Sequence, residues 1–186
     1  MISKKDNIEK MKELNLNFFP LEVFDVRNLE MIKNFFDQNS AEEYVLRTVE
    51  KAKGAFFYVS NFQEAKEKLK EFHNEVAISV SYRPYKDKII LVGDINIAKV
   101  EDDFVVDLIA RSDSEATNRN IYEKPEYNFH TDLKDETLWQ VDGIDKIIRY
   151  IAEKGLTEYI VEFSVYDCKI GVNKENVVIS EIRKDY

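Results

Sequence analysis

Two strand-like segments close this chain, and each of them carries a carboxylate. Residues 159–168 and 177–183 are rich in Val, Ile, Phe and Tyr, the residue types that favour β-strands. A short link with turn-forming residues separates them, so we expect an antiparallel pair. Glu162 lies in the first segment, while Glu181 and Arg183 lie in the second. The end of the chain therefore predicts a fold that contains an antiparallel sheet.

The alternation of apolar residues predicts a face for each carboxylate, because residues i and i+2 of a strand point to the same side. Val161 and Phe163 share one face of the first strand, which leaves Glu162 on the other. On the second strand the alternation predicts Ile179 on the same face as Glu181. Two such carboxylates fit a Mg²⁺ site, since Mg²⁺ commonly takes one or two carboxylates together with substrate phosphates. They fit equally an ordinary ion pair on a solvated sheet face, and both interpretations stay open.

Three further side chains are candidates for a functional site. Arg47 follows three apolar residues in a predicted strand at 43–49, where a guanidinium can hold a phosphate through two hydrogen bonds or pair with a nearby Glu. Arg111 ends another predicted strand and is a second candidate for anion binding. The polar segment that follows, residues 112–136, is long for a passive loop and contains His130. This histidine is a candidate for acid–base chemistry, although such residues are more often simply exposed.

Periodicity along the rest of the chain predicts an α+β fold in two lobes. The predicted helices cover residues 3–14, 29–36, 62–72 and 142–155, and the predicted strands cover 21–26, 43–49, 55–59, 76–82, 88–98 and 104–111. The predicted N-caps are Asn28, Asn61 and Asp142, and the predicted helix stops are residues 15–17, just before Pro20, and Gly155. We expect residues 1–75 to form a small mixed α/β lobe. Residues 76–186 should form a lobe built on an antiparallel sheet, with helix 142–155 packed on it.

The composition argues against several classes of protein. A net charge of −9 disfavours a general affinity for DNA or RNA, which needs a basic surface. The single cysteine, Cys168, excludes an internal disulfide and a cysteine-rich zinc site, and it suits a reducing compartment. The sequence shows no signal-peptide pattern and no apolar run of the length that a membrane helix needs. We therefore expect a cytoplasmic protein without a membrane partner.

Several short motifs, taken in chain order, resemble those of one known family. Residues 11–20 lead from a helix into a segment that ends at a proline. Residues 45–48, Val-Leu-Arg-Thr, are followed by Gly54, and the closing strands carry Glu162-Phe163 and Glu181-Ile-Arg183. This order is similar to the nucleotide-binding region of the ATP-grasp proteins, in the branch of phosphoenolpyruvate synthase and pyruvate phosphate dikinase. The resemblance implies a two-lobed ATP-grasp-like fold with antiparallel or mixed sheets and packed helices.

The resemblance also implies ATP and Mg²⁺ as ligands, and phosphotransfer or ligation onto an acceptor that the sequence does not name. The residues expected to carry these roles are Arg47, Lys53 and Arg111 for the nucleotide, Glu162 and Glu181 for Mg²⁺, and Arg183 with Arg47 for phosphoryl transfer. Such a site works by positioning and by neutralising charge.

A second function class keeps the same fold without the chemistry. The glycine-rich loop of the family is reduced here to Lys51-Ala-Lys-Gly54. The alternative is therefore a non-catalytic interaction protein, of the kind found in phage or defence systems, that binds a protein partner. An exposed aromatic patch would be typical of that class.

Overall fold

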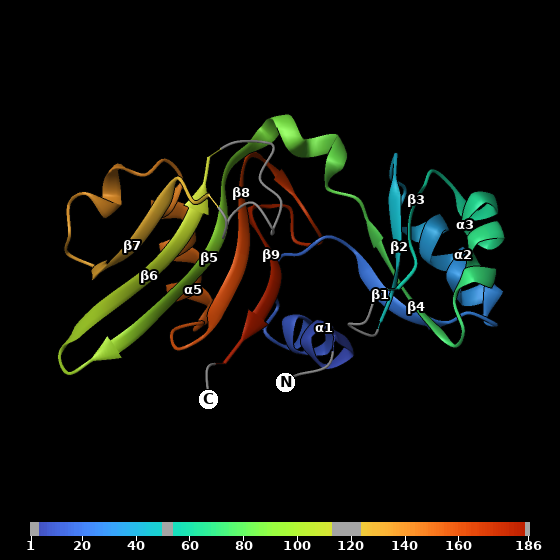
Figure 1. Cartoon of the computed structure of the whole chain (residues 1–186), viewed down its shortest axis with the longest axis horizontal. Coiled ribbons are helices and arrows are strands. Elements are labelled where there is room, and N and C mark those ends of the chain that lie inside the picture. Colours follow the sequence, from blue (N-terminus) through green and yellow to red (C-terminus); the bar gives the residue numbers. More distant parts are fainter. Residues whose placement is uncertain (1–3, 50–53, 113–123, 185–186) are drawn as a thin grey trace. The chain divides into compact units, whose positions relative to one another are not determined.

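The computed structural model describes residues 4–49, 54–112 and 124–184, and these residues fall into two compact units (Figure 1). The first unit comprises Met1–Glu9 and Phe19–Pro84, and the second comprises Lys10–Phe18 and Tyr85–Tyr186. Helix α1 (Lys4–Glu13) is divided between them. No helix within the described ranges is long and apolar enough to cross a membrane.

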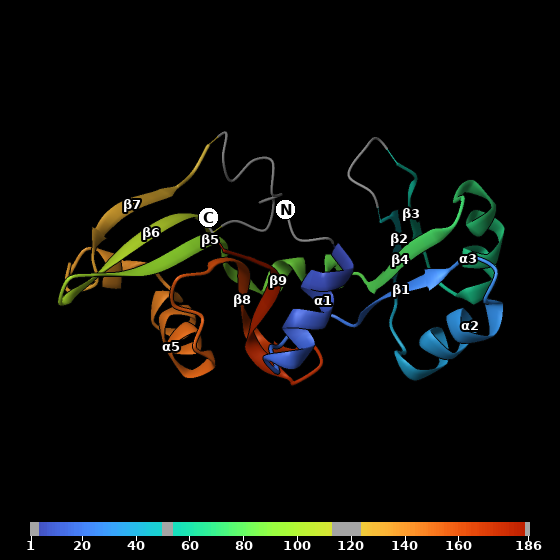
Figure 2. The same ribbon diagram turned by 90° about the horizontal axis from the view of Figure 1, so that it is seen from below.

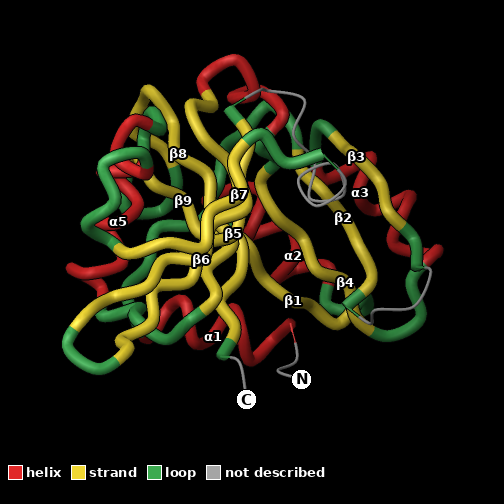
Figure 3. The backbone as a smooth tube through the Cα atoms, turned by 60° about the vertical axis from the view of Figure 1, so that its left-hand side comes forward, coloured by secondary structure: helices red, strands yellow, loops and turns green. Residues whose placement is uncertain are grey.

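The first unit is a four-stranded antiparallel sheet with helices on one face. Its strands, in the spatial order β1-β4-β2-β3, are β1 (Leu21–Asp25), β4 (Glu75–Val80), β2 (Tyr44–Thr48) and β3 (Phe56–Val59). The helices are α2 (Leu29–Gln38), α3 (Phe62–Lys68) and the short η1 (Leu69–Glu71). Figure 3 shows the strands as neighbouring yellow tubes. An apolar core between sheet and helices includes Ile32, Phe35, Leu46 and Ile78, each at most 5% exposed.

Two predicted helix caps are confirmed in this unit. The side chain of Asn28 accepts a hydrogen bond from the amide of Met31 at 3.2 Å, and that of Asn61 accepts one from the amide of Glu64 at 3.0 Å. Each bond satisfies an amide that the first turn of a helix otherwise leaves without a partner. The two polar residues therefore fix where α2 and α3 begin.

Strand β4 lies in the first unit, although the sequence assigned residues from 76 onward to the second lobe. It pairs with β1 on one side and with β2 on the other. Its side chains at Val76 and Ile78 belong to the apolar core of this unit. The pairing with β1 joins residues about fifty positions apart, and a local pattern of apolar residues does not reveal such a partner.

The second unit is a five-stranded antiparallel sheet with helix α5 against one face (Figure 2). Its strands, in the order β7-β6-β5-β8-β9, are β7 (Tyr127–Asp132), β6 (Asp103–Arg111), β5 (Ile89–Val100), β8 (Ile160–Ile170) and β9 (Glu175–Arg183). The helical segments are η2 (Arg83–Lys88), η3 (Leu138–Gln140) and α5 (Ile144–Lys154). Helix α5 buries Ile144, Ile147 and Ile151 to 1% exposure or less. The predicted α+β class with antiparallel sheets and packed helices is confirmed.

Two local predictions for this unit were wrong. Strand β7 lies inside residues 112–136, which the sequence predicted as irregular, because none of its six residues is fully buried and its pattern is weak. The N-cap of helix α5 is Gly143, which has φ of 83°, and not the predicted Asp142. The predicted stop at Gly155 is confirmed, since this residue takes φ of 65° and its amide bonds to carbonyls of the last turn.

A buried asparagine fastens the β8–β9 hairpin to the segment after α1. The Asn17 side chain donates to the carbonyl oxygens of Ile170 at 2.9 Å and Val177 at 2.7 Å. Its own oxygen accepts from the amide of Asn173 at 2.9 Å, and its backbone amide donates to the Tyr150 hydroxyl at 2.6 Å. These contacts fix the end of the hairpin whose other end carries Glu162 and Glu181.

Candidate functional site

Three carboxylates lie side by side on adjacent strands of the second sheet. Asp94 of β5 is directly opposite Glu162 of β8, and Glu162 is directly opposite Glu181 of β9. We call these three residues the carboxylate row. Directly opposed residues of antiparallel strands have Cβ atoms about 5 Å apart, so the row concentrates negative charge on one face. That face is opposite to the one that carries the buried neighbours Val161 and Ile182.

A β-bulge at Ser180 sets the orientation of Glu181. Glu162 and Phe163 are consecutive on β8, but their partners on β9 are Glu181 and Ile179, so Ser180 is an extra residue. Ile179 therefore shares the face of Phe163, while Glu181 shares the face of Glu162. The predicted placement of Ile179 and Glu181 on one face was wrong, because it assumed an uninterrupted alternation along the strand.

Arg183 reaches across the sheet to the carboxylate row. It lies opposite Ile160 of β8, yet its Nη2 is 2.9 Å from the Oδ2 of Asp94, one strand further. Its Nε is 3.8 Å from the Oε1 of Glu181. Sequence reasoning placed Arg183 near Glu181 but missed Asp94. The signal was present, since Asp94 is a carboxylate in the middle of an apolar strand, as Glu162 is.

Burial and charge act on Asp94 in opposite directions. Its side chain is 13% exposed, whereas that of Arg183 is 44% exposed. Burial raises the pKa of the Asp94 carboxyl, the guanidinium of Arg183 opposes this rise, and the charge of Glu181 adds to it. Burial therefore disfavours the ionised form of Asp94, and the positive charge of Arg183 offsets part of this cost.

The remaining predicted residues lie in different parts of the molecule. Arg111 of β6 is opposite Val92 of β5, two residues before Asp94, so it shares the face of the carboxylate row. Its Nη1 donates to the carbonyl oxygen of Lys124 at 2.8 Å.

Arg47 belongs to the first unit. It lies on β2 opposite Phe56 of β3 and Ala77 of β4, and its side chain is partly buried. Lys53 lies outside the described residues. The roles predicted for Arg47 and Lys53 at a nucleotide stay predictions.

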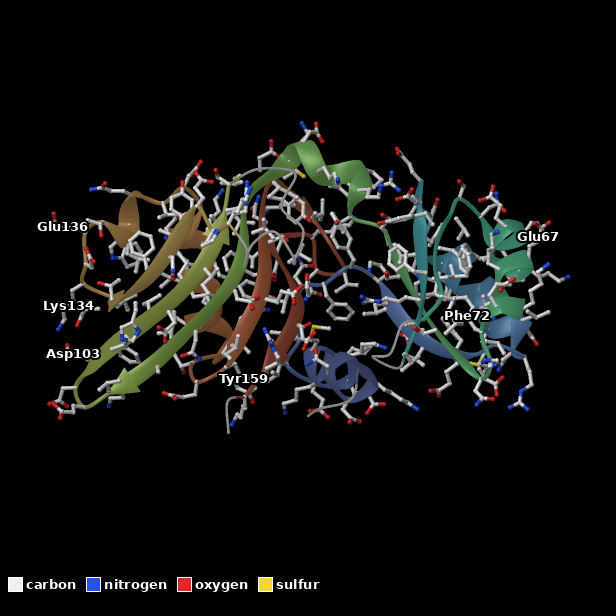
Figure 4. All side chains as sticks on the ribbon, viewed as in Figure 1. Glu67, Phe72, Asp103, Lys134, Glu136 and Tyr159 are labelled. Atoms are coloured by element: carbon white, nitrogen blue, oxygen red, sulfur yellow. The ribbon has the colours of Figure 1, made fainter. Side chains whose placement is uncertain are left out.

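A histidine–aspartate pair lies on the same face as the carboxylate row. His130 of β7 is directly opposite Asp107 of β6, and its Nδ1 contacts the Asp107 carboxylate. Both side chains are more than half exposed. A second pair, Asp103 with Lys134, lies at the hairpin end of β6 (Figure 4). Exposed pairs of this kind contribute little to stability.

The donor set for a metal ion consists of two carboxylates. Glu162 and Glu181 face each other across one strand pair, and carboxylate oxygens are the ligands that Mg²⁺ prefers. Within the described residues, no group of three or more His, Cys, Asp or Glu side chains converges closely enough to hold a metal ion by itself. The residues therefore fit an ion that takes its other ligands from water or from a phosphate, and they do not form a closed protein cage.

Comparison by sequence gives no match to any family model or to any characterised protein. Comparison by structure gives clear matches to ATP-grasp enzymes. A D-alanine–D-alanine ligase from Coxiella burnetii has a TM-score of 0.53, with 13% identity over 98% of this chain and 47% of its own. An N5-carboxyaminoimidazole synthase from Aspergillus clavatus, bound to ADP and 5-aminoimidazole ribonucleotide, has a TM-score of 0.54, with 13% identity over 97% of this chain and 43% of its own.

A further structure is the carboxyaminoimidazole ribonucleotide synthase of Aspergillus clavatus with ATP, at a TM-score of 0.51, with 14% identity over 97% of this chain and 44% of its own. At these identities the likeness shows the fold, and the chain has an ATP-grasp fold, as the sequence motifs predicted. The chain spans somewhat under half the length of these three structures. The narrower resemblance to the phosphoenolpyruvate synthase branch stays a prediction.

Proposed function

We propose that this chain is a domain that binds ATP and Mg²⁺ and supports ligation or phosphotransfer onto an acceptor. The carboxylate row carries the proposal, because it puts Glu162 and Glu181 directly opposite each other on one face of the sheet. The ATP-grasp fold supports it further, since two of the similar structures contain ADP or ATP. The acceptor, and the branch of the ATP-grasp enzymes to which the domain is closest, are open to experiment.

Each charged residue has a role in this proposal. Glu162 and Glu181 would hold Mg²⁺, which supplies positive charge to the phosphate groups during transfer. Arg183 and Arg111 add positive charge on the same face of the sheet. Arg47 would bind phosphate oxygens through its planar guanidinium, and Lys53 would attract them as a point charge. These residues position the nucleotide and neutralise charge, and they take no part in covalent chemistry.

The proposal also covers the setting of the protein. We place its activity in the cytoplasm, where the single cysteine would stay reduced. We propose a small anionic nucleotide as its ligand and no nucleic acid, because the net charge of −9 opposes a polyanion while a few local cations can hold a phosphate.

Thermal unfolding in the presence of nucleotides tests the proposal. A ligand at about 100 times its dissociation constant stabilises the folded state by roughly 2.7 kcal/mol. We expect a rise in the melting temperature with ATP and Mg²⁺ together, and a smaller rise with ATP and a chelator or with Mg²⁺ alone. If well-folded protein shows no shift with any nucleotide, the proposed function is wrong.

One observation favours a second candidate function, binding of a protein partner without catalysis. Strand β3 is an edge strand, and its Phe56 and Tyr58 are 51% and 41% exposed. Their ring centroids are 5.1 Å apart, so they form a small aromatic surface. A folded chain that binds no nucleotide in the melting experiment would favour this candidate. Substitution of Phe56 and Tyr58 would then be the next step.

A further inference from the structure

The side chain of Arg183 is anchored at one end of the carboxylate row. An arginine at the end of a strand has many rotamers available and is normally free to move in water. Here the guanidinium spans β8 and bonds to Asp94 of β5 at 2.9 Å. Asp94 is the buried partner of the pair, with 13% of its side chain exposed. Because charges interact more strongly away from bulk water, Asp94 fixes the guanidinium more firmly than an exposed carboxylate would.

The direction of this contact matters for the two residues that we propose as metal ligands. Arg183 has its shorter contact with Asp94 and its longer one, 3.8 Å, with Glu181. The guanidinium is therefore held by Asp94 more closely than by Glu181, one of the two proposed metal ligands.

We infer that Asp94 is a positioning residue that holds Arg183 beside the Glu162–Glu181 pair, so that Arg183 meets the terminal phosphate of the bound nucleotide. The inference rests on the proposed function and adds to it the residue that makes the site distinguish ATP from ADP. Without Asp94, the nearest carboxylate that the guanidinium contacts is Glu181. A bond there would draw Arg183 away from the position in which it meets the terminal phosphate, a group that ADP lacks. Loss of Asp94 should therefore weaken binding of the triphosphate more than binding of the diphosphate.

Calorimetric titration with a non-hydrolysable ATP analogue and with ADP, each with Mg²⁺, tests this inference. We expect Asp94→Asn and Arg183→Ala each to weaken binding of the ATP analogue about tenfold, which is the size of one charge-assisted hydrogen bond. Each should weaken binding of ADP less than about twofold. The double variant should bind no more weakly than Arg183→Ala alone, because Asp94 acts through Arg183. Asp94→Glu should recover part of the preference for the ATP analogue.

Asp103→Asn is the matched control, since Asp103 is also a carboxylate paired with a cation, Lys134, on the same sheet (Figure 4). It should leave both affinities unchanged. The inference is overturned if Asp94→Asn leaves the ratio of the two affinities at its wild-type value, weakens both nucleotides equally, or adds its full effect to that of Arg183→Ala. If the wild-type protein binds neither nucleotide, the proposed function itself fails. The melting temperature shows whether each variant is folded. If Asp94→Asn does not fold, Asp94→Glu takes its place in the comparison.

Discussion

Asn17 shows how one polar residue can hold a local structure together. It is fully buried. Its side-chain nitrogen donates to two carbonyl oxygens of the β8–β9 hairpin, and its side-chain oxygen accepts from one backbone amide of the hairpin. The fit is close, because a Cβ added to Gly171 would lie 2.4 Å from the Asn17 side-chain oxygen. From the sequence, Asn17 reads only as the end of the first helix, since its partners lie about 150 residues away.

We predict that Asn17→Ala lowers the free energy of unfolding by about 3 kcal/mol, because it leaves several buried backbone groups without partners. Urea denaturation measures this change. Asn34→Ala is a suitable control, since Asn34 is exposed on α2 and its loss should change stability by less than about 0.5 kcal/mol. A value for Asn17→Ala that equals the control would contradict the role given to Asn17.

The Asp94 carboxyl predicts a dependence of stability on pH. Its folded-state pKa is raised, chiefly by burial, so the unfolded chain loses this proton at lower pH than the folded chain does. The contribution of Asp94 to stability therefore falls as the pH rises from about 4 through the raised pKa. Asp94→Asn lacks this loss, so its stability relative to wild type should improve between pH 4 and pH 7. Denaturation of both proteins at pH 4 and pH 7 measures this difference in stability. If Asp94→Asn instead loses stability relative to wild type as the pH rises, the ion pair with Arg183 outweighs burial.

At the scale of elements, the sequence predicted most of the helices and strands but not every register. The caps at Asn28 and Asn61 and the stop at Gly155 are local signals, and the structure confirms them. The bulge at Ser180 and the position of β4 in the first sheet depend on pairing between distant segments. Asp94 carries a local signal, a carboxylate within an apolar strand, but its place beside Glu162 depends on the pairing of β5 with β8.

The bulge can be tested by removing its extra residue. Deletion of Ser180 removes the bulge and leaves Ile179, Glu181 and Ile182 opposite Phe163, Glu162 and Val161, so each keeps its face. We expect a change of less than about 1 kcal/mol in the free energy of unfolding, because no apolar side chain becomes exposed and no carboxylate becomes buried. Ser180→Ala should be nearly neutral, because Ser180 is exposed. A loss of several kcal/mol in the deletion variant would contradict the register, since it would mean that Glu181 or Ile182 had changed face.

The start of α5 gives a second test at this scale. Gly143→Ala should cost about 1–2 kcal/mol, because φ is 83° and an added Cβ would lie 3.2 Å from the Cγ2 of Ile90. Asp142→Ala should cost less than about 0.5 kcal/mol, since Asp142 is exposed and makes no cap. Thermal denaturation measures the loss of stability in each variant. A larger loss for Asp142→Ala than for Gly143→Ala would show that Asp142 is the cap.

For the whole molecule, the sequence motifs identified the fold better than they identified the site. Short motifs in a fixed order predicted an ATP-grasp fold, and the structural likeness confirms it at identities near 13%. The faces of the closing strands could not be read from alternation alone, because a bulge interrupts it. The proposed function depends on the carboxylate row, which forms only when β5, β8 and β9 pair.

Isothermal titration of ATP with Mg²⁺ into the variant Glu162→Gln/Glu181→Gln tests the central claim most directly. The variant removes both proposed metal ligands and changes the shape of the site little. Its control is Glu136→Gln/Glu153→Gln, which changes the net charge equally at two exposed positions. We predict that the control binds like the wild type and that the site variant binds at least tenfold more weakly, about 1.4 kcal/mol. Wild-type affinity in the site variant would contradict the claim that Glu162 and Glu181 hold the metal of a nucleotide site.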